Sequence, residues 1–192
     1  MRRVGVLALQ GDVREHVAML NELDVDVVRV RQPEDFDALD GLVLPGGEST
    51  TIAYLLTTSG IRPVLEERIA QGFSVFGTCA GLILLSREIL GGRSDQWSYG
   101  ALDISVRRNG YGRQIASFES PVEVTGVGEV PGVFIRAPKI ERWSSDVEVL
   151  AVLDHGDGEH PVLVRNENVW GCAFHPELTG DHRVHQLFTE SL

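Results

Sequence analysis

Cys79 is the residue whose surroundings point most clearly to chemistry. It lies in the segment Gly77-Thr-Cys-Ala-Gly81, directly after the apolar run Phe73–Phe76. The pattern Gly-x-nucleophile-x-Gly after a strand is typical of a nucleophile elbow, a sharp turn between a strand and a helix. Such a turn holds the thiol at the positive end of a helix and directs the N–H of Ala80 towards an oxyanion. An isolated cysteine is more often a buried structural residue, but the glycines and the strand favour a nucleophile.

A thiol nucleophile needs a base, and the base needs an acceptor that orients it. Of the six histidines, His175 is distinguished because it ends the strand-like run Val169–Phe174 and is followed by Pro176 and Glu177. Residues i and i+2 of an extended segment point to the same side, so Glu177 is predicted to accept a hydrogen bond from the ring of His175. A surface turn is the alternative interpretation of this tripeptide.

The other histidines show no comparable pattern. His155 lies in the acidic loop Asp154–Glu159 and is predicted to be solvated. His182 and His185 are three residues apart on a predicted helix, a spacing that can chelate a metal, but no cysteine or carboxylate pattern completes a site. We therefore predict neither a metal nor a cofactor.

A second oxyanion donor is predicted in Pro45-Gly-Gly-Glu-Ser49, which follows another strand-like run. Paired glycines let backbone N–H groups approach a ligand closely, although a plain turn before a helix explains the segment equally well. It is not a phosphate-binding loop, because the pattern G-x-x-x-x-G-K-[ST] is missing and Lys139 is the only lysine of the chain.

These motifs depend on an alternation of strands and helices in the first half of the chain. The expected strands are Val4–Leu9, Val25–Val30, Leu42–Leu44 and Phe73–Phe76. The expected helices run from Asp12, in a capping box with Glu15, to Leu23; from a Ser49 cap to Leu56; from Pro63 to near Gly72; and through Leu82–Leu85. This rhythm predicts an α/β fold with three layers, in which a mostly parallel central sheet is flanked by helices.

The second half changes to short strands separated by Gly, Asp and Asn turns, which indicates additional antiparallel strands. The expected strands are Ile104–Val106, Ile115–Phe118, Val122–Val124, Val133–Ile135, Val147–Leu153, Pro161–Val164 and Val169–Phe174, and a last helix spans His182–Glu190. Without a repeat or a linker, residues 1–192 are predicted to form a single domain.

Composition limits the classes of partner. The 192 residues carry a formal net charge of −11, so neither nucleic acid nor a membrane is expected as a partner. The segment Met1–Gln10 is too short for a signal peptide, and no apolar run approaches the ~20 residues of a membrane span, so we expect a cytoplasmic protein. In a reducing compartment the two cysteines, Cys79 and Cys172, are expected to stay free thiols.

Taken together, the motifs resemble the class I (triad) glutamine amidotransferases, whose fold is flavodoxin-like, and more closely the PdxT family, the glutaminase subunits of pyridoxal 5′-phosphate synthase. The likeness covers nearly the whole chain. The matching segments are Gly5–Gly11, Val13–His16, Leu44–Thr50, Gly77–Leu85, Arg108-Asn109, Tyr111–Gln114, Phe134–Pro138 and Phe174–Leu178. Gly110 is a departure, since the family more often has Ser or Ala there. The loop Asp154–Glu159 looks like an insertion and is expected to lie away from the motifs.

The resemblance implies that Cys79 is the nucleophile and that His175 and Glu177 assist it. It places the substrate, L-glutamine, at Gly47, Glu48, Ser49, Arg108, Ile135 and Arg136. Arg108 or Arg136 is suited to bind the α-carboxylate as a planar fork. The candidate oxyanion donors are the N–H groups of Gly47 and Ala80.

The activity implied is hydrolysis of L-glutamine to L-glutamate and ammonia. The family supplies this ammonia to a PdxS-type synthase subunit that makes pyridoxal 5′-phosphate, and docking of that partner in a hetero-oligomeric complex is expected to complete the oxyanion hole. Three alternatives remain: the glutaminase subunit of another amidotransferase such as imidazole glycerol phosphate synthase, a cysteine hydrolase that shares the elbow, and a scaffold that binds a synthase without hydrolysing glutamine.

Overall fold

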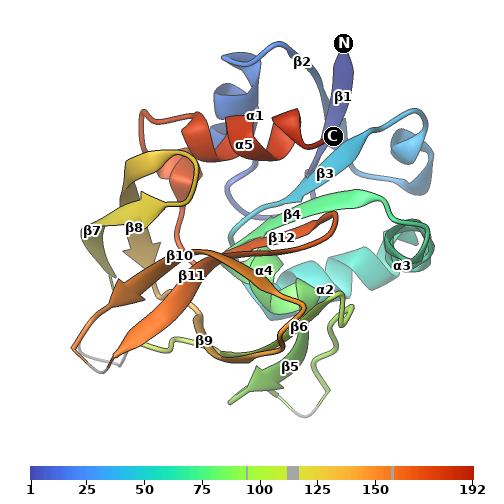
Figure 1. The fold of residues 1–192 in the computed structure, drawn as a ribbon. Coiled ribbons are helices and arrows are strands. Elements are labelled where there is room, and N and C mark those ends of the chain that lie inside the picture. Colours follow the sequence, from blue (N-terminus) through green and yellow to red (C-terminus); the bar gives the residue numbers. More distant parts are fainter. Residues whose placement is uncertain (94, 112–116, 157) are drawn as a thin grey trace.

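A seven-stranded sheet runs through the centre of the computed structural model, which describes residues 1–93, 95–111, 117–156 and 158–192 (Figure 1). Five of its strands are parallel to their neighbours, and the other two, β10 and β11, are added antiparallel at one edge. In spatial order the strands are β10 (Glu148–Asp154), β11 (Glu159–Asn166), β12 (Val169–Cys172), β4 (Ser74–Thr78), β3 (Gly41–Leu44), β1 (Arg2–Leu7) and β2 (Val25–Val30).

The three central parallel strands β3, β4 and β12 are buried along their whole length because helices cover both faces of the sheet. All four residues of β3 and of β12, and all five of β4, are buried. Val43 pairs with Phe76, and Phe76 pairs with Trp170, so two of the largest buried side chains, Phe76 and Trp170, lie in adjacent strands.

The helices form two outer layers (Figure 1). One layer contains α1 (Val13–Asn21) and α5 (Arg183–Glu190), and the other contains α2 (Ser49–Thr58), α3 (Ile61–Ala70) and the short α4 (Ala80–Leu85). Two 3₁₀ turns, η1 (Pro33–Phe36) and η2 (Pro176–Leu178), complete the helical elements of the described residues. The predicted three-layer fold with a mostly parallel central sheet is therefore confirmed.

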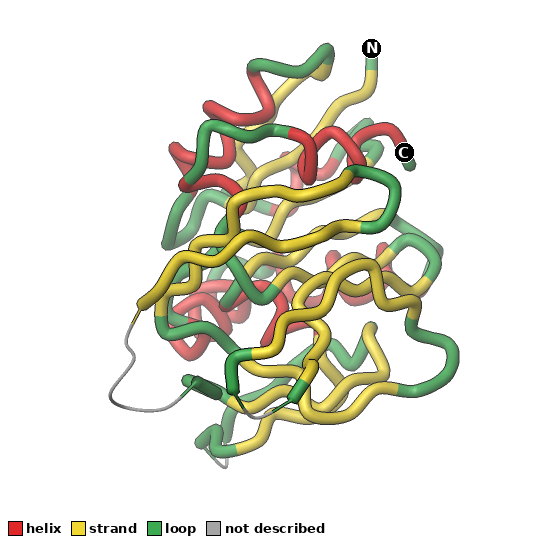
Figure 2. The backbone as a smooth tube through the Cα atoms, turned by 60° about the vertical axis from the view of Figure 1, so that its left-hand side comes forward, coloured by secondary structure: helices red, strands yellow, loops and turns green. Residues whose placement is uncertain are grey.

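Two smaller sheets pack beside the central one. The first has the order β5 (Ser86–Leu90), β6 (Leu102–Arg107) and β9 (Lys139–Trp143); the second is a hairpin of β7 (Ser117–Val124) and β8 (Gly128–Ile135). Buried residues of all three sheets belong to one hydrophobic cluster. Figure 2 shows the two termini near each other at one end of the molecule, where Arg2 donates a hydrogen bond to the carbonyl of Glu190 at 3.2 Å.

Several predicted elements differ from those observed. The strands β5 and β9 were not predicted, because their alternating charged residues conceal a pairing with β6 that lies far away in sequence. The two strands predicted at Ile115–Phe118 and Val122–Val124 are one strand, β7, with Ile115 and Ala116 outside the described residues. Pro121 lies directly opposite Pro131 in the hairpin, so both prolines sit inside a two-stranded ribbon.

The predicted helix starts also need correction. Helix α3 begins at Ile61 rather than Pro63, after Gly60 in a left-handed conformation. Glu48, not Ser49, caps α2, since its carboxylate accepts from the N–H groups of Thr50 and Thr51. Asp12 precedes α1 but makes no capping hydrogen bond.

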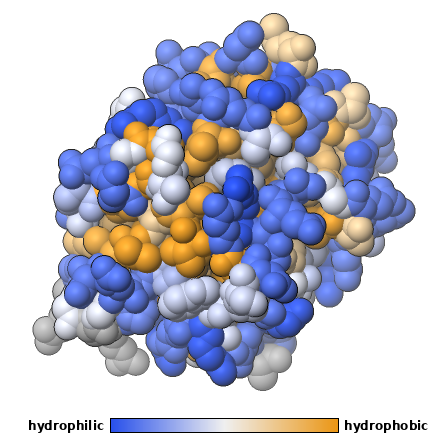
Figure 3. All heavy atoms as spheres, viewed as in Figure 1, coloured by the Kyte–Doolittle hydropathy of each residue, from blue (hydrophilic) through white to orange (hydrophobic). Residues whose placement is uncertain are grey.

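The face of the molecule in Figure 3 is hydrophilic around its margin, with a group of apolar residues across its left and centre. No helix within the described ranges is long and apolar enough to span a bilayer. The carboxyl ends of β1, β3, β4 and β12 meet at one edge of the central sheet, since Leu44 pairs with Gly77 and Cys172 with Thr78. In open α/β sheets ligands bind at this edge.

Candidate active site

Cys79 occupies the turn between β4 and α4, in a backbone conformation that is strained for any residue but glycine. Its φ is 48° and its ψ is −100°. The N–H of Cys79 donates to the carbonyl of Cys172 at 2.8 Å, and its carbonyl accepts from the N–H of Ile83 at 3.2 Å. Strain of this kind persists only where the surroundings fix it, and here two backbone hydrogen bonds hold the nucleophile at the end of the strand.

The glycines on either side of Cys79 are required by close backbone approaches. A Cβ on Gly77 would lie 2.5 Å from the carbonyl carbon of Gly81, and a Cβ on Gly81 would lie 2.2 Å from the carbonyl oxygen of Leu44. Helix α4 thus starts in direct contact with β3 and β4. The Gly-x-Cys-x-Gly spacing reflects this packing as well as the turn itself.

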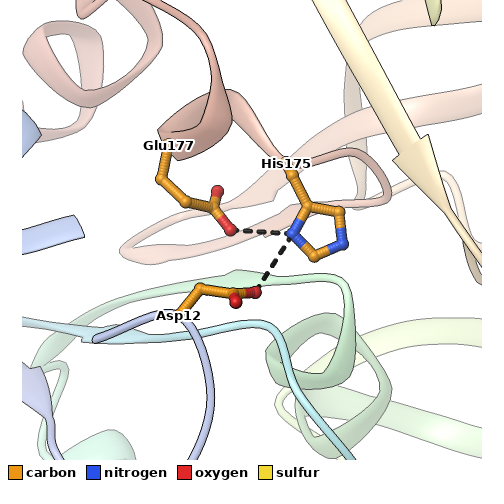
Figure 4. A group of neighbouring side chains, drawn as sticks. All are labelled: Asp12, His175 and Glu177. Atoms are coloured by element: carbon orange, nitrogen blue, oxygen red, sulfur yellow. Dashed lines mark hydrogen bonds and ion pairs between the residues drawn. The ribbon is translucent and has the colours of Figure 1, made fainter. Parts of the chain in front are cut away.

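His175 and Glu177 lie together just beyond β12 (Figure 4). His175 Nδ1 is 2.7 Å from Glu177 Oε1, and both side chains are buried. Glu177 is on the 3₁₀ turn η2, so the pair does not share the extended segment from which the contact was predicted. The turn brings the carboxylate back under the ring, and the N–H of His175 donates to the carbonyl of Val133 at 2.8 Å, which fixes the residue against β8.

Asp12 is a second carboxylate at the same ring nitrogen, and the sequence did not indicate it. Its Oδ2 lies 3.4 Å from His175 Nδ1 (Figure 4). Burial by itself would lower the pKa of His175, but interactions with Asp12, Cys79 and Glu177 outweigh it and raise the pKa well above its usual value. His175 therefore holds a proton firmly, as the general acid beside a thiolate must.

Cys79 and His175 face a shared pocket of about 290 Å³. Cys79 as a residue is 7% exposed, and its Sγ lies 3.9 Å from the carbonyl oxygen of Ile135. Among the described residues His175 Nε2 makes no hydrogen bond, although the thiol contributes to the raised pKa of the ring. Every residue expected to bind glutamine also lines this pocket: Gly47, Glu48, Ser49, Arg108, Ile135 and Arg136.

Glu48 and Arg108 are held in a fixed arrangement on one wall of the pocket. Arg108 donates to Glu48 at 3.1 Å and to the side-chain oxygen of Gln96 at 3.0 Å, and Gln96 in turn donates to Ser49 Oγ at 3.0 Å. Hydrogen bonds from Thr50 and Thr51 outweigh partial burial and lower the pKa of Glu48 to about 2, so it is a carboxylate at neutral pH. Gln96 was missed by the sequence analysis, because a lone glutamine in a loop gives no local signal.

Arg136 presents a second positive charge at the pocket. It is exposed, has a φ of 44°, and makes no hydrogen bond or ion pair with any described residue. Its guanidinium thus contrasts with that of Arg108, two of whose nitrogens are already occupied.

The segment Gly46-Gly47 packs tightly on the end of β1. A Cβ on Gly46 would lie 2.5 Å from His175 Cε1, and a Cβ on Gly47 would lie 2.6 Å from Gln10 Oε1. Gln10 also accepts a hydrogen bond from the N–H of Glu48 at 2.9 Å. Both glycines are therefore needed for this backbone to pass beside the imidazole, where an oxyanion donor is expected. Ala80, the other expected donor, is buried directly after Cys79.

One expectation about the neighbouring loops changes. The loop Asp154–Glu159 does not lie apart from the motifs; its residue 157 is outside the described residues. The ring of His155 stacks on that of Phe118, with 4.2 Å between the ring centroids, and contacts the ring of Tyr111, which belongs to a matching segment. His155 is exposed, as predicted, and its ring also packs against these two aromatic rings. The Gly-Arg-Gln stretch at 112–114, which contributed to the resemblance, lies outside the described residues.

The departure at Gly110 has a steric reason. A Cβ at this position would lie 2.1 Å from the Cβ of Lys139, and the N–H of Gly110 donates to the carbonyl of Ala137 at 3.0 Å. Glycine lets the loop that carries Arg108 run directly along the start of β9.

Metal binding has one geometric candidate among the described residues, the group Asp12, His175 and Glu177, whose ligand atoms lie within 4.8 Å of one another. Within this group His175 is hydrogen-bonded to Glu177 and lies at ion-pair distance from Asp12. His182 and His185 are not part of it: His185 is fully buried, and its ring is directed to His16.

Comparison with known proteins places this geometry in a family. The model described as the SNO glutamine amidotransferase family matches residues 6–192. The pyridoxal 5′-phosphate synthase subunit PdxT of Mycobacteroides abscessus is 53% identical, with 97% of this chain and 95% of that protein aligned. The protein of the same name from Streptomyces griseus is also 53% identical, with 97% and 94% aligned.

Solved structures agree with these relatives. A crystal structure described as a glutamine amidotransferase has a TM-score of 0.91 and 49% identity, covering 98% of this chain and 97% of that one. The structure of PurLQS from Thermotoga maritima has a TM-score of 0.68 at 18% identity and supports the fold alone; it covers 98% of this chain and 97% of that one.

Proposed function

Since the chain belongs to the SNO glutamine amidotransferase family, we propose that it hydrolyses L-glutamine to L-glutamate and ammonia and supplies the ammonia for pyridoxal 5′-phosphate synthesis. The observation that carries the proposal is a strained cysteine and a carboxylate-bound histidine facing one pocket. Cys79 is the nucleophile, His175 the acid and base, and Glu177 the acceptor that orients His175.

The reaction proceeds in two halves. The thiolate of Cys79 attacks the side-chain amide carbon of glutamine, and the imidazolium of His175 gives its proton to the departing ammonia. The C–N bond breaks and a glutamyl thioester remains. Neutral His175 then takes a proton from water, whose oxygen attacks the thioester carbon, and the C–S bond breaks to release glutamate and restore the thiolate.

The tetrahedral intermediates of both halves carry a negative oxygen. We assign the N–H groups of Gly47 and Ala80 as its hydrogen-bond donors. Losing one such donor typically costs about 3–4 kcal/mol of barrier, or a few hundred-fold in rate. The close packing of Gly46-Gly47 on Gln10 and His175 supports this role, because it limits how far that backbone can move.

The pocket offers complementary charges to the α-amino acid end of glutamine. The carboxylate of Glu48 faces the α-ammonium group, while Arg136 and Arg108 supply positive charge for the α-carboxylate. Gly47, Ser49 and Ile135 line the walls of the same pocket. Arg136 has both guanidinium edges available to a planar fork, whereas Arg108 is held by Glu48 and Gln96.

Ammonia in neutral water is mostly ammonium and a poor nucleophile, so a partner that receives it directly is the economical arrangement. The relatives are named as subunits of pyridoxal 5′-phosphate synthase, and we propose that a PdxS-type synthase subunit docks on this chain in a hetero-oligomer. Docking completes the oxyanion hole, so the chain alone is a slow glutaminase. We further propose that residues 1–192 act as one amidotransferase domain in the cytoplasm.

Glutamate release, measured with and without the synthase subunit, tests the proposal. Replacing Cys79 with Ala should abolish release while leaving the circular dichroism spectrum unchanged. Cys172→Ala is the matched control, since that thiol is fully buried and donates only to the carbonyl of Phe174. Substantial glutamine hydrolysis by the Cys79 variant would refute the assignment. Stimulation by the synthase of imidazole glycerol phosphate instead would reassign the partner.

A further inference from the structure

Two buried histidines lie behind the pocket and have no part in the reaction described above. His16 on α1 and His185 on α5 are both 0% exposed and are separated by 169 residues. His16 Nδ1 lies 2.9 Å from His185 Nε2, and the ring centroids are 5.1 Å apart. A hydrogen bond between two imidazoles that far apart in sequence joins the two helices of one outer layer.

The other edge of the His16 ring faces the catalytic groups. Its Nε2 lies 3.1 Å from Thr78 Oγ1, at the end of β4, and 3.5 Å from Glu177 Oε1. That carboxylate oxygen is the one that lies 2.7 Å from His175 Nδ1. A continuous buried path therefore runs from His185 through His16 and Glu177 to the imidazole of the active site.

Both histidines are neutral in this environment. Burial, reinforced by His185 and His175, lowers the pKa of His16 well below its usual value. Burial and the nearby His182 lower the pKa of His185 to about 4. Each ring therefore carries one N–H at neutral pH, and the position of that hydrogen is decided by the available acceptors.

A single proton occupies the contact between His16 Nδ1 and His185 Nε2, which leaves two arrangements. If His16 donates there, His185 must carry its hydrogen on Nδ1, which is buried and has no partner among the described residues. If His185 donates from Nε2, the hydrogen of His16 is on Nε2, where Thr78 Oγ1 accepts it at 3.1 Å and the carboxylate of Glu177 lies 3.5 Å away. The second arrangement leaves no buried N–H unpaired. In the first arrangement the lone pair of His16 Nε2 would also face the carboxylate oxygen of Glu177, which is repulsive. The second arrangement is therefore the more stable.

We propose that His16 is a positioning residue that donates its Nε2–H to Glu177, in the tautomer selected by His185. The proposal rests on the proposed function and adds a residue to it. Glu177 Oε1 then receives one N–H from His175 and shares a second from His16 with Thr78. A carboxylate held from two sides cannot turn away from His175, so the imidazole stays aligned with the thiol of Cys79.

Histidine tautomers in the unmodified chain can be read directly. Two-bond ¹H–¹⁵N spectra of ¹⁵N-labelled protein at neutral pH should show His16 and His185 as neutral Nε2–H rings, assigned with His16→Gln and His185→Gln. Finding His16 as the Nδ1–H tautomer, or as a charged ring, would overturn the proposal. This measurement needs neither turnover nor a substitution in the protein whose tautomers are read.

Two substitutions at His16 distinguish a role as a hydrogen-bond donor from a role in packing alone. His16→Leu removes the donor and should lower kcat for glutamine about tenfold to a hundredfold, because a small displacement of a catalytic group is costly. KM should stay within twofold of the parent, because His16 does not line the pocket. His16→Gln carries an amide N–H near the position of Nε2 and should restore kcat to within about fivefold of the parent, as expected where one donor is replaced by a slightly displaced one. Equal losses in both folded variants would contradict the proposal.

Alkylation of Cys79 by iodoacetamide gives a second readout without glutamine. In His16→Leu the rate should fall and its pH profile should move to higher pH, since a misaligned His175 stabilises the thiolate less. Cys172 is 0% exposed, so it should not react with iodoacetamide and serves as an internal control. His160→Leu removes a half-buried histidine from β11, and this control variant should react like the parent. An unchanged profile in His16→Leu would count against the proposal.

Failure of this inference and failure of the proposed function are distinguishable. A parent protein that releases glutamate, with a His16→Leu variant of equal kcat and reactivity, would remove the positioning role and leave the glutaminase intact. A parent that releases no glutamate with its synthase subunit would instead remove the function, whatever tautomer His16 adopts.

Discussion

At the scale of single residues, the imidazole of His175 is contacted by two carboxylates that differ in kind. Glu177 is buried and accepts at 2.7 Å, whereas Asp12 is 35% exposed and lies 3.4 Å away. A single N–H cannot be well aligned with both. Glu177 thus sets the orientation of the ring, and Asp12 contributes mainly charge.

This division predicts the pH behaviour of Asp12→Asn. His175 has a pKa above its usual value, so the enzyme keeps the proton it must donate until the pH is high, and Asp12 is a principal cause of that rise. Removing its charge should lower the pKa of His175 and move the alkaline limb of the kcat/KM profile to lower pH, while the value at the optimum falls only a few-fold.

Asp24→Asn is the matched control, because Asp24 is exposed in the turn between α1 and β2. Its profile should coincide with that of the parent. An alkaline limb that stays at the same pH in Asp12→Asn would show that the carboxylate of Asp12 does not act on the ring of His175.

Gln96 carries a separate prediction about substrate binding. It joins Arg108 to Ser49, and it does not line the pocket itself. Gln96→Ala should raise KM for glutamine about five- to tenfold with little change in kcat, the effect of losing about 1 kcal/mol of hydrogen bonding that orients Arg108.

Arg93→Ala on the same loop provides the comparison for Gln96, because Arg93 is an exposed residue paired with Asp95. Its KM should match that of the parent. A fall in kcat without a rise in KM for Gln96→Ala would contradict a role in binding.

The residue scale also shows what a sequence can reveal of a site. Cys79, His175 and the glutamine-binding candidates stand in short local patterns, and the structure brings them to one pocket. Asp12, His16 and Gln96 act through contacts with residues far away in the chain, up to 169 positions for His16, and no local pattern records such contacts.

At the scale of elements, the elbow is the part of the molecule with the least tolerance for change. Helix α4 has six residues, all buried, and begins in contact with both β3 and β4. Its position is therefore set by packing of the backbone rather than by helix propensity, which is weak for so short a segment.

Gly81→Ala tests this packing. The new Cβ would meet the carbonyl oxygen of Leu44 at 2.2 Å, and a backbone atom in the central sheet cannot move aside cheaply. We expect the free energy of unfolding, measured by urea denaturation, to fall by about 3 kcal/mol, in the upper range for overpacking.

Gly180→Ala should leave the stability of the chain nearly unchanged, because no heavy atom lies within 4 Å of the added Cβ. If Gly81→Ala were as stable as the Gly180 variant, the contact between α4 and β3 could not be the reason for the second glycine of the motif.

Elements were predictable from sequence where their neighbours in space are also near in the chain. The parallel core, β1 to β4 with its helices, follows from alternating apolar runs and turn residues. The strand β5 pairs with β6 and β9 with β6, and their charged faces reveal nothing of burial. A strand that is half exposed at the side of a domain has too little apolar pattern to be recognised before its partner is known.

At the scale of the whole molecule, the three sheets share one core. Buried residues of the central sheet, of the sheet β5-β6-β9 and of the hairpin β7-β8 belong to a single cluster. The hairpin also supplies Val133, which accepts a hydrogen bond from His175, so the geometry of the active site depends on contacts between the sheets.

This shared core predicts that residues 1–192 unfold as one unit. The three tryptophans report on different regions: Trp170 is buried in β12, Trp143 is partly exposed in β9, and Trp97 lies in the loop between β5 and β6. In urea, the midpoint from tryptophan fluorescence should coincide with the midpoint from far-UV circular dichroism, because no sheet can lose its core contacts without exposing those of the others.

Variants that keep one tryptophan at a time, with Phe at the other two positions, should give the same midpoint as their own circular dichroism curves. An earlier transition reported by Trp143 alone would show that the small sheet β5-β6-β9 is a separate cooperative unit, and the chain would then have to be described as two units with the active site fixed by only one of them.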